Sequence, residues 1–320
     1  MSSWIRDAPK KAPKKAEPFV RLGESVEPTE SPPDIVPYPI PSALFAPGQR
    51  VVVPSRLNNT IESRPSAASN PITIKAEPAQ PPVAQMEAAA EVTISIVIPL
   101  YNGIEFLEDA LQSVKRQTYK NWDCVIGVNG HGDTGEPVLT KAKRIVQKLA
   151  LENRVRVLNL PSVSGGAQAI NALVAETTAP YVAHLDADDI WLPKKLEVQM
   201  AAMTNPSDFG IVGTWCRYFG ESTSSPNLPG GSLRRADFYK TNPLIHSSIL
   251  IKRDLAHYTD EFVTYDYDCW IRNIGNDVKI FNVNSILVLH RIHKASFYNS
   301  SKTQQPELVR EKYGFVEPTA

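Results

Sequence analysis

Apolar runs alternate with helical patterns from residue 92 to residue 189, and this alternation limits the possible folds more than any other feature of the chain. Four runs are typical of strands: "VTISIVIPL", "WDCVIGV", "VRVLNL" and "APYVAHLDADD". The stretches between them, "IEFLEDALQSVKRQ", "GEPVLTKAKRIVQKLAL" and "GGAQAINALVAET", place apolar residues at helical spacing. Such alternation predicts a parallel sheet that is covered by helices on both faces.

The second half of the chain follows a less regular pattern. "DFGIVGTWCRYFG" and "HSSILIKRDL" are typical of strands, "YDYDCWIRNI" of a short helix, and "VKIFNVNSILVLHRIH" of two closing strands. These elements predict a mixed region that lies beside the parallel half. We therefore expect an α/β fold, with one folded unit over residues 91–320.

Prolines set residues 1–90 apart from the rest of the chain. Sixteen of the 27 prolines fall there, in stretches such as "ESPPDIVPYPIPSALFAPG". Because neither a helical nor a strand period survives, we expect a mostly disordered, proline-rich arm. Its basic stretch "PKKAPKKA" fits either a solvated tail or a docking element for an anionic partner.

Charge and cysteine content argue against several classes of protein. The formal net charge is zero at pH 7, so there is no global electrostatic basis for binding nucleic acid. Three widely spaced cysteines without a CxxC pair argue against a disulfide scaffold and a structural zinc site. No run reaches the ~18 apolar residues of a transmembrane segment, and the first residues lack the apolar core of a secretory signal. We expect a cytoplasmic protein, with peripheral membrane contact left open.

Three aspartates, Asp186, Asp188 and Asp189, directly follow the fourth predicted strand. Ligands of parallel α/β sheets bind at the carboxyl ends of the strands, so these acids should share a crevice with Tyr101 and Asn129. Asp186 and Asp188 point to the same side of an extended chain, which suits a divalent cation such as Mg²⁺. The alternative is a set of acids near the positive end of the helix "PKKLEVQMAAM", which explains Asp189 best.

Five stretches occur in an order and spacing that resemble family 2 glycosyltransferases of the GT-A fold. They are "SIVIPLYNG", "GGAQAINAL", "YVAHLDADDIWLPKKLE", "NPLIHSSILIKR" and "YDYDCWIR", and the resemblance covers roughly residues 92–295. It implies a Rossmann-like GT-A domain with a mixed central sheet. It also implies an inverting, hexosyltransferase-type enzyme that moves a sugar from a nucleotide diphosphate to the hydroxyl of a glycan, lipid-linked or protein acceptor.

On the donor side, the resemblance implies that Pro99 and Tyr101 lie against the nucleobase. Tyr101 could equally be an aromatic side chain that caps the core at a strand end. Asn129 stands where the family typically has an aspartate that hydrogen-bonds uracil. A UDP-sugar is favoured as donor, but this substitution puts the preference for uridine in doubt because an amide donates as well as accepts.

The resemblance also implies contacts to the diphosphate and the ribose. Gly166 would let the backbone approach the diphosphate, although a Gly-Gly pair also fits a plain turn. Asn171 would bind the donor and Asp186 would contact its ribose. Asp188 would be the direct ligand of Mn²⁺ or Mg²⁺, and His293 would complete the metal shell or touch the diphosphate.

Alignment on Trp270 implies that Asp266 is the general base, in metal-assisted transfer. Asp268 is the rival, and one of these two acids could simply cap the helix. Tyr265 stands where the family usually has Glu, and Ile170 stands where it commonly has Arg. These departures, with Asn129, leave a catalytically silent binding or scaffold module as an alternative. A nucleotidyltransferase is a second alternative, weakened by the absence of a Gly-rich basic loop after the first strand.

Overall fold

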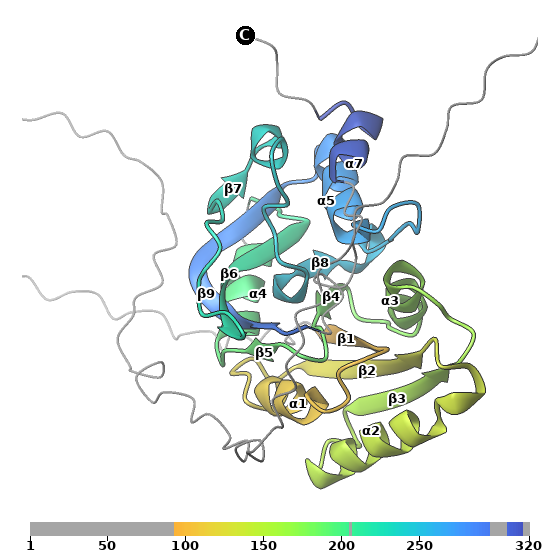
Figure 1. Ribbon diagram of the computed structural model, residues 1–320. Helices are drawn as coiled ribbons and strands as arrows, with labels where there is room; N and C mark the ends of the chain where they lie inside the picture. The colour runs from red at the N-terminus through yellow and green to blue at the C-terminus, as the bar shows by residue number, and fades with distance from the viewer. Residues whose placement is uncertain (1–92, 205–206, 295–305, 316–320) are drawn as a thin grey trace, which may run out of the picture. The chain divides into compact units, whose positions relative to one another are not determined.

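The computed structural model describes residues 93–204, 207–294 and 306–315 of the chain (Figure 1). The expected arm over residues 1–90 lies outside the described residues. The strands are β1 (Ile94–Leu100), β2 (Trp122–Asn129), β3 (Val155–Leu160), β4 (Tyr181–His184), β5 (Ile190–Trp191), β6 (Ile211–Gly220), β7 (Gly231–Leu233), β8 (Leu250–Lys252) and β9 (Ile280–Ile292). The helices are α1 (Leu107–Lys115), α2 (Glu136–Lys148), α3 (Gly166–Ala175), α4 (Lys195–Met203), α5 (Tyr265–Gly275) and α7 (Pro306–Lys312).

The described strands form one sheet in the order β3-β2-β1-β4-β8-β6-β9-β5, with β7 paired to β9. The first four strands are mutually parallel, as their alternation with helices predicted. Strand β8 is antiparallel to both β4 and β6, whereas β6 and β9 are parallel. The expected α/β fold with a mixed second half is therefore confirmed.

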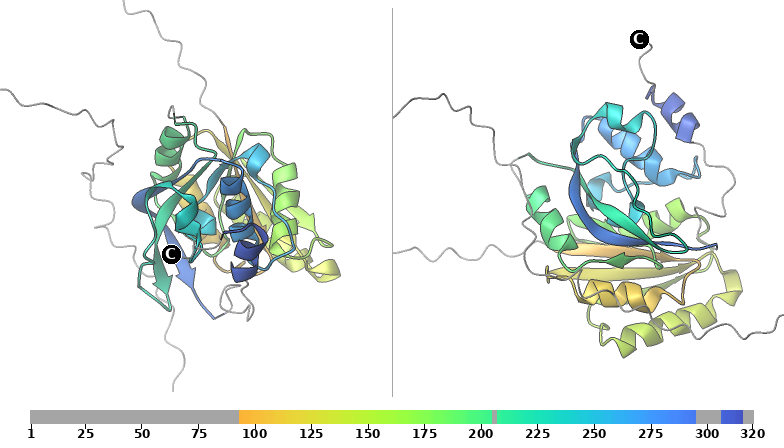
Figure 2. Two further views of the ribbon diagram at one scale, coloured as in Figure 1. Left: turned by 90° about the horizontal axis from the view of Figure 1, so that it is seen from above. Right: turned by 60° about the vertical axis from the view of Figure 1, so that its left-hand side comes forward.

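Side chains of β1 alternate between two apolar cores, one on each face of the sheet. Ile94, Ile96 and Ile98 belong to the core that includes residues of α1, α2 and α4. Val97 belongs to the core that includes residues of α3, α5 and α7. Figure 2 shows α1 and α2 together on one face of the sheet. Each buried isoleucine contributes about 2 kcal/mol, so this two-sided burial stabilises β1 as the central strand of the parallel half.

The expectation of two closing strands near the C-terminal end is wrong. Residues 280–292 form the single strand β9, which continues through the polar stretch around Asn282. The Asn282 amide donates to the carbonyl oxygens of Pro229 and Pro243, so a buried polar residue is accommodated without a turn. Register shifts on either side of Trp215 in β6 let the pair β6–β9 bend, and Figure 1 shows β9 as a long curved strand.

The C-terminal helix α7 lies against α5, beyond the stretches that carry the family resemblance. Val309 and Phe315 are fully buried and join the same apolar core as α5. The guanidinium of Arg235 lies 3.9 Å from the centre of the Phe315 ring. This segment therefore belongs to the folded unit. The three cysteines are free and buried, and none of the described helices has the length and apolar run needed to cross a bilayer.

Candidate active site

Each of the three aspartates that follow β4 lies against its own histidine. The pairs, with oxygen–nitrogen distances, are Asp186–His246 (3.1 Å), Asp188–His293 (2.8 Å) and Asp189–His290 (2.8 Å). His246 precedes β8, and the other two histidines come from the end of β9 and the residue after it. The sequence analysis named His293 but missed His290, because nothing in the local pattern links His290 to an acid 101 residues earlier.

Asp189 is the innermost of the three acids and holds the loop to β9. Its fully buried carboxylate accepts hydrogen bonds from His290 and from the backbone N–H of Arg291. Burial alone would lower the pKa of His290, but the negative charge and hydrogen bond of Asp189 raise it to about 9. Strand β5 separates Asp189 from α4, so the acids are not at the start of that helix, contrary to the alternative considered above.

Asp186 and Asp188 stay open to solvent, with 31% and 22% of their side chains exposed. Burial opposes ionisation of Asp186, but the charge and hydrogen bond of His246 lower its pKa to about 2. Burial raises the pKa of Asp188, and the charges of Asp189 and Asp186 raise it further, to about 6. The two open acids thus differ: His246 stabilises the anion of Asp186, whereas burial and neighbouring carboxylates make Asp188 easier to protonate.

The surroundings of Asp188 fit a divalent cation. Its carboxylate oxygen and the His293 imidazole nitrogen are two donor atoms close together at the carboxyl ends of β4 and β9, the expected crevice region, and cations of the Mn²⁺ type accept both oxygen and nitrogen ligands. A cation would also relieve the repulsion that raises the pKa of Asp188. Among the described residues, no group of three or more His, Cys, Asp or Glu side chains is arranged around a metal position. Further ligands would therefore have to come from substrate and water.

Arg291 lies beside this site and is held in place from several sides. Its guanidinium Nε donates to the backbone oxygen of Asp188 at 2.9 Å. The same guanidinium lies 4.2 Å from the Phe106 ring centre and 4.3 Å from that of Phe219. These contacts hold Arg291 against the loop that carries the three aspartates. One nitrogen of its guanidinium lies 3.7 Å from a carboxylate oxygen of Asp109.

The ends of β1 and β2 place Tyr101 and Asn129 at the same sheet edge, because the register pairs Leu100 with Val128. Tyr101 is 56% exposed and stacks on His131, with 5.2 Å between ring centres, so it does not cap the core. Asn129 is buried, and its Oδ1 has no hydrogen-bond partner within the described part of the chain. The exposed Tyr101 ring offers a face for a flat heterocycle, whereas the unpartnered Asn129 oxygen lies below the surface. Pro99 lies within β1, opposite Gly127.

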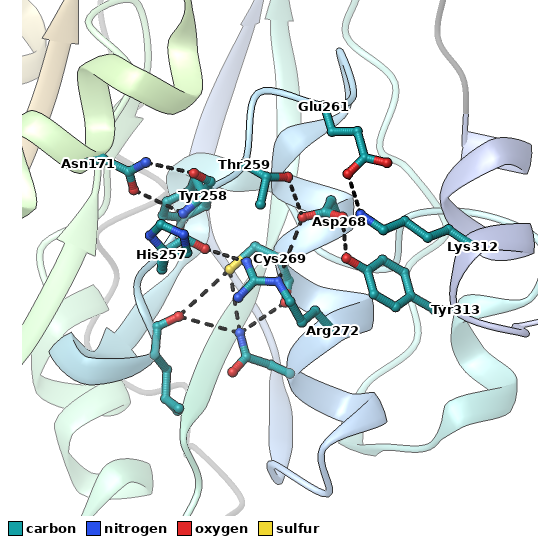
Figure 3. Close-up of polar contacts among 12 residues, drawn as sticks. Asn171, His257, Tyr258, Thr259, Glu261, Asp268, Cys269, Arg272, Lys312 and Tyr313 are labelled. Carbon is teal, nitrogen blue, oxygen red and sulfur yellow. Dashed lines mark hydrogen bonds and ion pairs between the residues drawn. The ribbon is translucent and has the colours of Figure 1, made fainter.

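The start of α3 is shaped by Tyr265 rather than left open. A Cβ at Gly166 would lie 2.5 Å from the Tyr265 ring, so glycine allows that ring to pack over the first turn. The Asn171 amide donates to the Tyr258 carbonyl oxygen at 2.6 Å and accepts from the Tyr258 backbone N–H at 2.9 Å, as Figure 3 shows. This double contact favours a positioning role for Asn171 over direct contact with a donor.

Ile170 and Tyr265 both depart from the family pattern, and both lie in or against the apolar core that includes residues of α3 and α5. Ile170 is fully buried, and Tyr265 packs against the same apolar core. Relative to the usual Arg and Glu, this chain lacks one cation and one anion there. Because isolated buried charges are costly, losing both is compatible with the fold.

Asp266 and Asp268, which sequence reasoning left as rivals, have different surroundings. Asp268 is fully buried and accepts hydrogen bonds from the Thr259 and Tyr313 hydroxyls, each at 2.9 Å, with Arg272 Nε at 3.8 Å (Figure 3). Asp266 accepts hydrogen bonds from Asn242 Nδ2, at 2.8 Å, and from the backbone N–H of Tyr267, and it interacts electrostatically with His246. Asp268 thus serves the packing of α5 against α7, whereas Asp266 lies on the side of His246 and Asp186, in the expected crevice region.

Sequence reasoning missed a buried polar cluster under the crevice. His184 is fully buried at the end of β4, its Nε2 lies 3.1 Å from the Tyr258 hydroxyl, and its ring centre lies 4.9 Å from that of His246. Burial lowers the pKa of His184 well below its usual value. Lys195 is also fully buried, donates to Gln199 at 2.8 Å and lies 3.9 Å from the Trp191 ring centre. Only the spacing of His184, two residues before Asp186, could have indicated this cluster.

Comparisons with known proteins identify the family of this chain. The sequence model of glycosyl transferase family 2 matches residues 95–259, and the chain belongs to that family. An uncharacterised glycosyltransferase of Methanocaldococcus jannaschii is 28% identical over 224 residues, which cover 66% of this chain and 75% of the relative. The O-antigen biosynthesis glycosyltransferase WbnJ of Escherichia coli is 27% identical over 217 residues, covering 65% and 83%.

Solved structures show the same fold. TarS of S. aureus in complex with UDP-GlcNAc has a TM-score of 0.55 at 13% identity, over 69% of this chain and 65% of that one. The mannosyltransferase PcManGT of Pyrobaculum calidifontis in complex with GDP-Man and Mn²⁺ has a TM-score of 0.51 at 13% identity, over 69% of both chains. The fold is therefore GT-A, and the chain is a glycosyltransferase. This assignment disfavours the nucleotidyltransferase and the silent module.

Proposed function

We propose that this glycosyltransferase transfers a sugar from a nucleotide diphosphate to an acceptor hydroxyl with inversion, and that Asp266 is the general base. The observation that carries the proposal is the difference between the two acids of α5. Asp268 is enclosed by hydroxyl donors, whereas Asp266 interacts with His246 and Asp186 in the crevice. A base must be within reach of the acceptor hydroxyl, and Asp268 is fully buried whereas Asp266 is only partly buried.

Some residues of this region would bind the sugar donor, and Asp266 would act on the acceptor. Tyr101 provides a ring face for the nucleobase, and Asn129 and Pro99 belong to the ends of the same two strands. Asp186 is ionised and open, which suits a ribose hydroxyl. Asp266 accepts the proton of the acceptor hydroxyl as its oxygen attacks the anomeric carbon from the face opposite the nucleotide, so the configuration inverts.

Asp188 and His293 are the residues that would hold Mn²⁺ or Mg²⁺. When bound, the cation neutralises charge on the departing diphosphate. The solved relatives bind UDP-GlcNAc and GDP-Man, and these ligands support a nucleotide-sugar donor here. The family match begins at residue 95, which supports a folded unit that starts near residue 91.

Thermal unfolding in the presence of a panel of nucleotide sugars tests the proposal. A ligand that binds only the native state raises the apparent melting temperature, so at least one UDP-, GDP- or other nucleotide-linked sugar should stabilise the protein with Mn²⁺. The same donor should stabilise less after EDTA treatment, and hydrolysis or transfer should follow with that donor alone. If none of the nucleotide sugars raises the melting temperature, the proposal that the donor is a nucleotide sugar is refuted.

A further inference from the structure

Residues 242–248 of the stretch "NPLIHSSILIKR" lie between the two halves of the proposed site. At one end, Asn242 Nδ2 donates to Asp266 Oδ2 at 2.8 Å. At the other end, His246 Nδ1 lies 3.1 Å from Asp186 Oδ1, and the Ser247 hydroxyl accepts from the Asp186 backbone N–H at 3.0 Å. One short stretch of chain therefore contacts both the proposed base and the proposed donor-side carboxylate.

The orientation of the Asn242 amide is fixed by the chain itself. Its Oδ1 accepts a hydrogen bond from the backbone N–H of Leu244 at 3.2 Å, across the intervening Pro243. Because Oδ1 is occupied, the amide nitrogen is the atom presented to Asp266. Asn242 contacts one carboxylate oxygen of Asp266, Oδ2, and so restricts the rotation of that carboxylate.

The remainder of the segment is anchored in the core. Trp191 Nε1 donates to the Ser247 carbonyl oxygen at 2.8 Å, and Gln199 Nε2 donates to the Ser248 carbonyl oxygen at 2.7 Å. Both donors belong to side chains that are fully or almost fully buried. Since these contacts restrict the backbone, the distance between Asn242 and His246 is set by the fold rather than by substrate.

We propose that Asn242 is a positioning residue that orients Asp266, and that residues 242–248 fix the base relative to the donor-side carboxylate Asp186. This inference rests on the proposed role of Asp266. The same logic orients bases in other hydrolases and transferases, where a third group holds the base by a hydrogen bond. Here the third group is a neutral amide that donates to a carboxylate.

Several neighbouring groups change the pKa of Asp266. Burial raises its pKa, whereas the charge of His246, the backbone amide of Tyr267 and the hydrogen bond of Asn242 lower it, and the charge of Asp186 raises it. The Tyr265 hydroxyl also interacts electrostatically with Asp266. Removing the Asn242 donor should therefore raise the pKa of Asp266, and replacing the donor by a carboxylate should raise it more.

Three variants separate positioning from general structural damage. Asn242→Ala removes the donor. Asn242→Asp keeps the shape and can still accept from the Leu244 N–H, but it presents a carboxylate to Asp266. Asn227→Ala changes an exposed asparagine and is the matched control. With saturating donor, kcat for transfer should fall about 10- to 100-fold in both Asn242 variants, because hydrogen bonds to charged groups have this weight.

Two further measurements decide the outcome. Donor affinity by calorimetry should stay unchanged in all three variants, since Asp186 is held separately by His246 and Ser247. The acid limb of the pH profile of kcat should move to higher pH in the order wild type, Asn242→Ala, Asn242→Asp, and Asn227→Ala should overlay the wild type. A loss of rate with an unmoved acid limb would show a merely structural role and overturn the proposal.

A readout that needs no activity keeps this inference distinct from the proposed function. The ¹³C-carboxyl signal of Asp266, assigned by its loss in Asp266→Asn, can be titrated directly. Its midpoint should rise in the same order of variants, and an unchanged midpoint would overturn the proposal. If instead Asp266→Asn transfers sugar at the wild-type rate, the assigned base fails, whatever the titration of Asn242 variants shows.

Discussion

Two clusters of carboxylates, one in the crevice after β4 and one between α5 and α7, contain the same chemical groups in opposite states. In the α5–α7 cluster, Asp268 is enclosed and receives two hydroxyl hydrogen bonds (Figure 3). In the crevice, burial and its acidic neighbours raise the pKa of Asp188 to about 6, and the Asn129 oxygen has no partner in the described chain. Asp268 therefore stabilises the packing of α5, whereas the ease of protonation of Asp188 favours a role toward a ligand.

Asp266 and Asp268 show this contrast within a single helix, α5. Both lie in the first two turns of one helix, only two residues apart, yet they point into different surroundings because successive helical residues differ by about 100° in direction. The helix therefore gives one acid to the crevice and the other to the packing of the C-terminal segment.

The largest expected effect comes from replacing each of these two acids by asparagine in turn. Asp266→Asn should bind donor normally and lower the rate of transfer by ~10²–10⁴, the usual effect of losing a general base. Asp268→Asn should keep much of the rate but lower the free energy of unfolding by about 1–3 kcal/mol, because buried hydroxyl donors lose their charged acceptor. Transfer kinetics and urea unfolding on both variants measure the difference. Near-wild-type transfer by Asp266→Asn, with an inactive and stable Asp268→Asn, would reverse the assignment.

A second pair of substitutions tests the different roles of Asp188 and Asp189 in the loop after β4. Asp188→Asn should keep the fold, because its carboxylate lies at the open edge, and should lose Mn²⁺-dependent binding of a nucleoside diphosphate. Asp189→Asn should instead lower stability, since the buried carboxylate ties the loop to His290 and Arg291. Calorimetric titration of UDP and GDP with and without Mn²⁺, beside thermal unfolding, separates the two. Unchanged metal-dependent affinity in Asp188→Asn would remove the metal assignment.

The smallest expected effect concerns the pH dependence of stability through His290. Its pKa is raised in the folded state to about 9, so its pairing with Asp189 stabilises fully below the unfolded value near 6.5 and is lost as the pH rises through 9. The contribution is on the order of 1–3 kcal/mol. His290→Gln should therefore lower stability most at pH 6, and its unfolding curve should approach that of wild type by pH 10. An equal difference at both pH values would show that packing, not charge, accounts for the effect.

Local patterns predicted the parallel half and the family well. The alternation of apolar runs and helical spacing gave β1 to β4 with α1 to α3, because each element buries one periodic face on the sheet. The Asp186/Asp188 spacing and the alignment on Trp270 indicated the crevice and the candidate base. The single strand β9 was missed, since the polar residues around Asn282 look like a turn until the carbonyl groups that satisfy them are known.

The chain's own sequence determined which residues reach the carboxyl edge of the sheet, because strand period and strand–helix order depend on neighbouring residues. It did not determine which histidine meets which aspartate, which acid of α5 faces the crevice, or that Asn242 contacts Asp266. Those pairings join residues 24 to 105 positions apart. Tertiary structure decided them, since burial and charge act through space and a residue's partner is fixed only when sheet register and helix packing bring the two together.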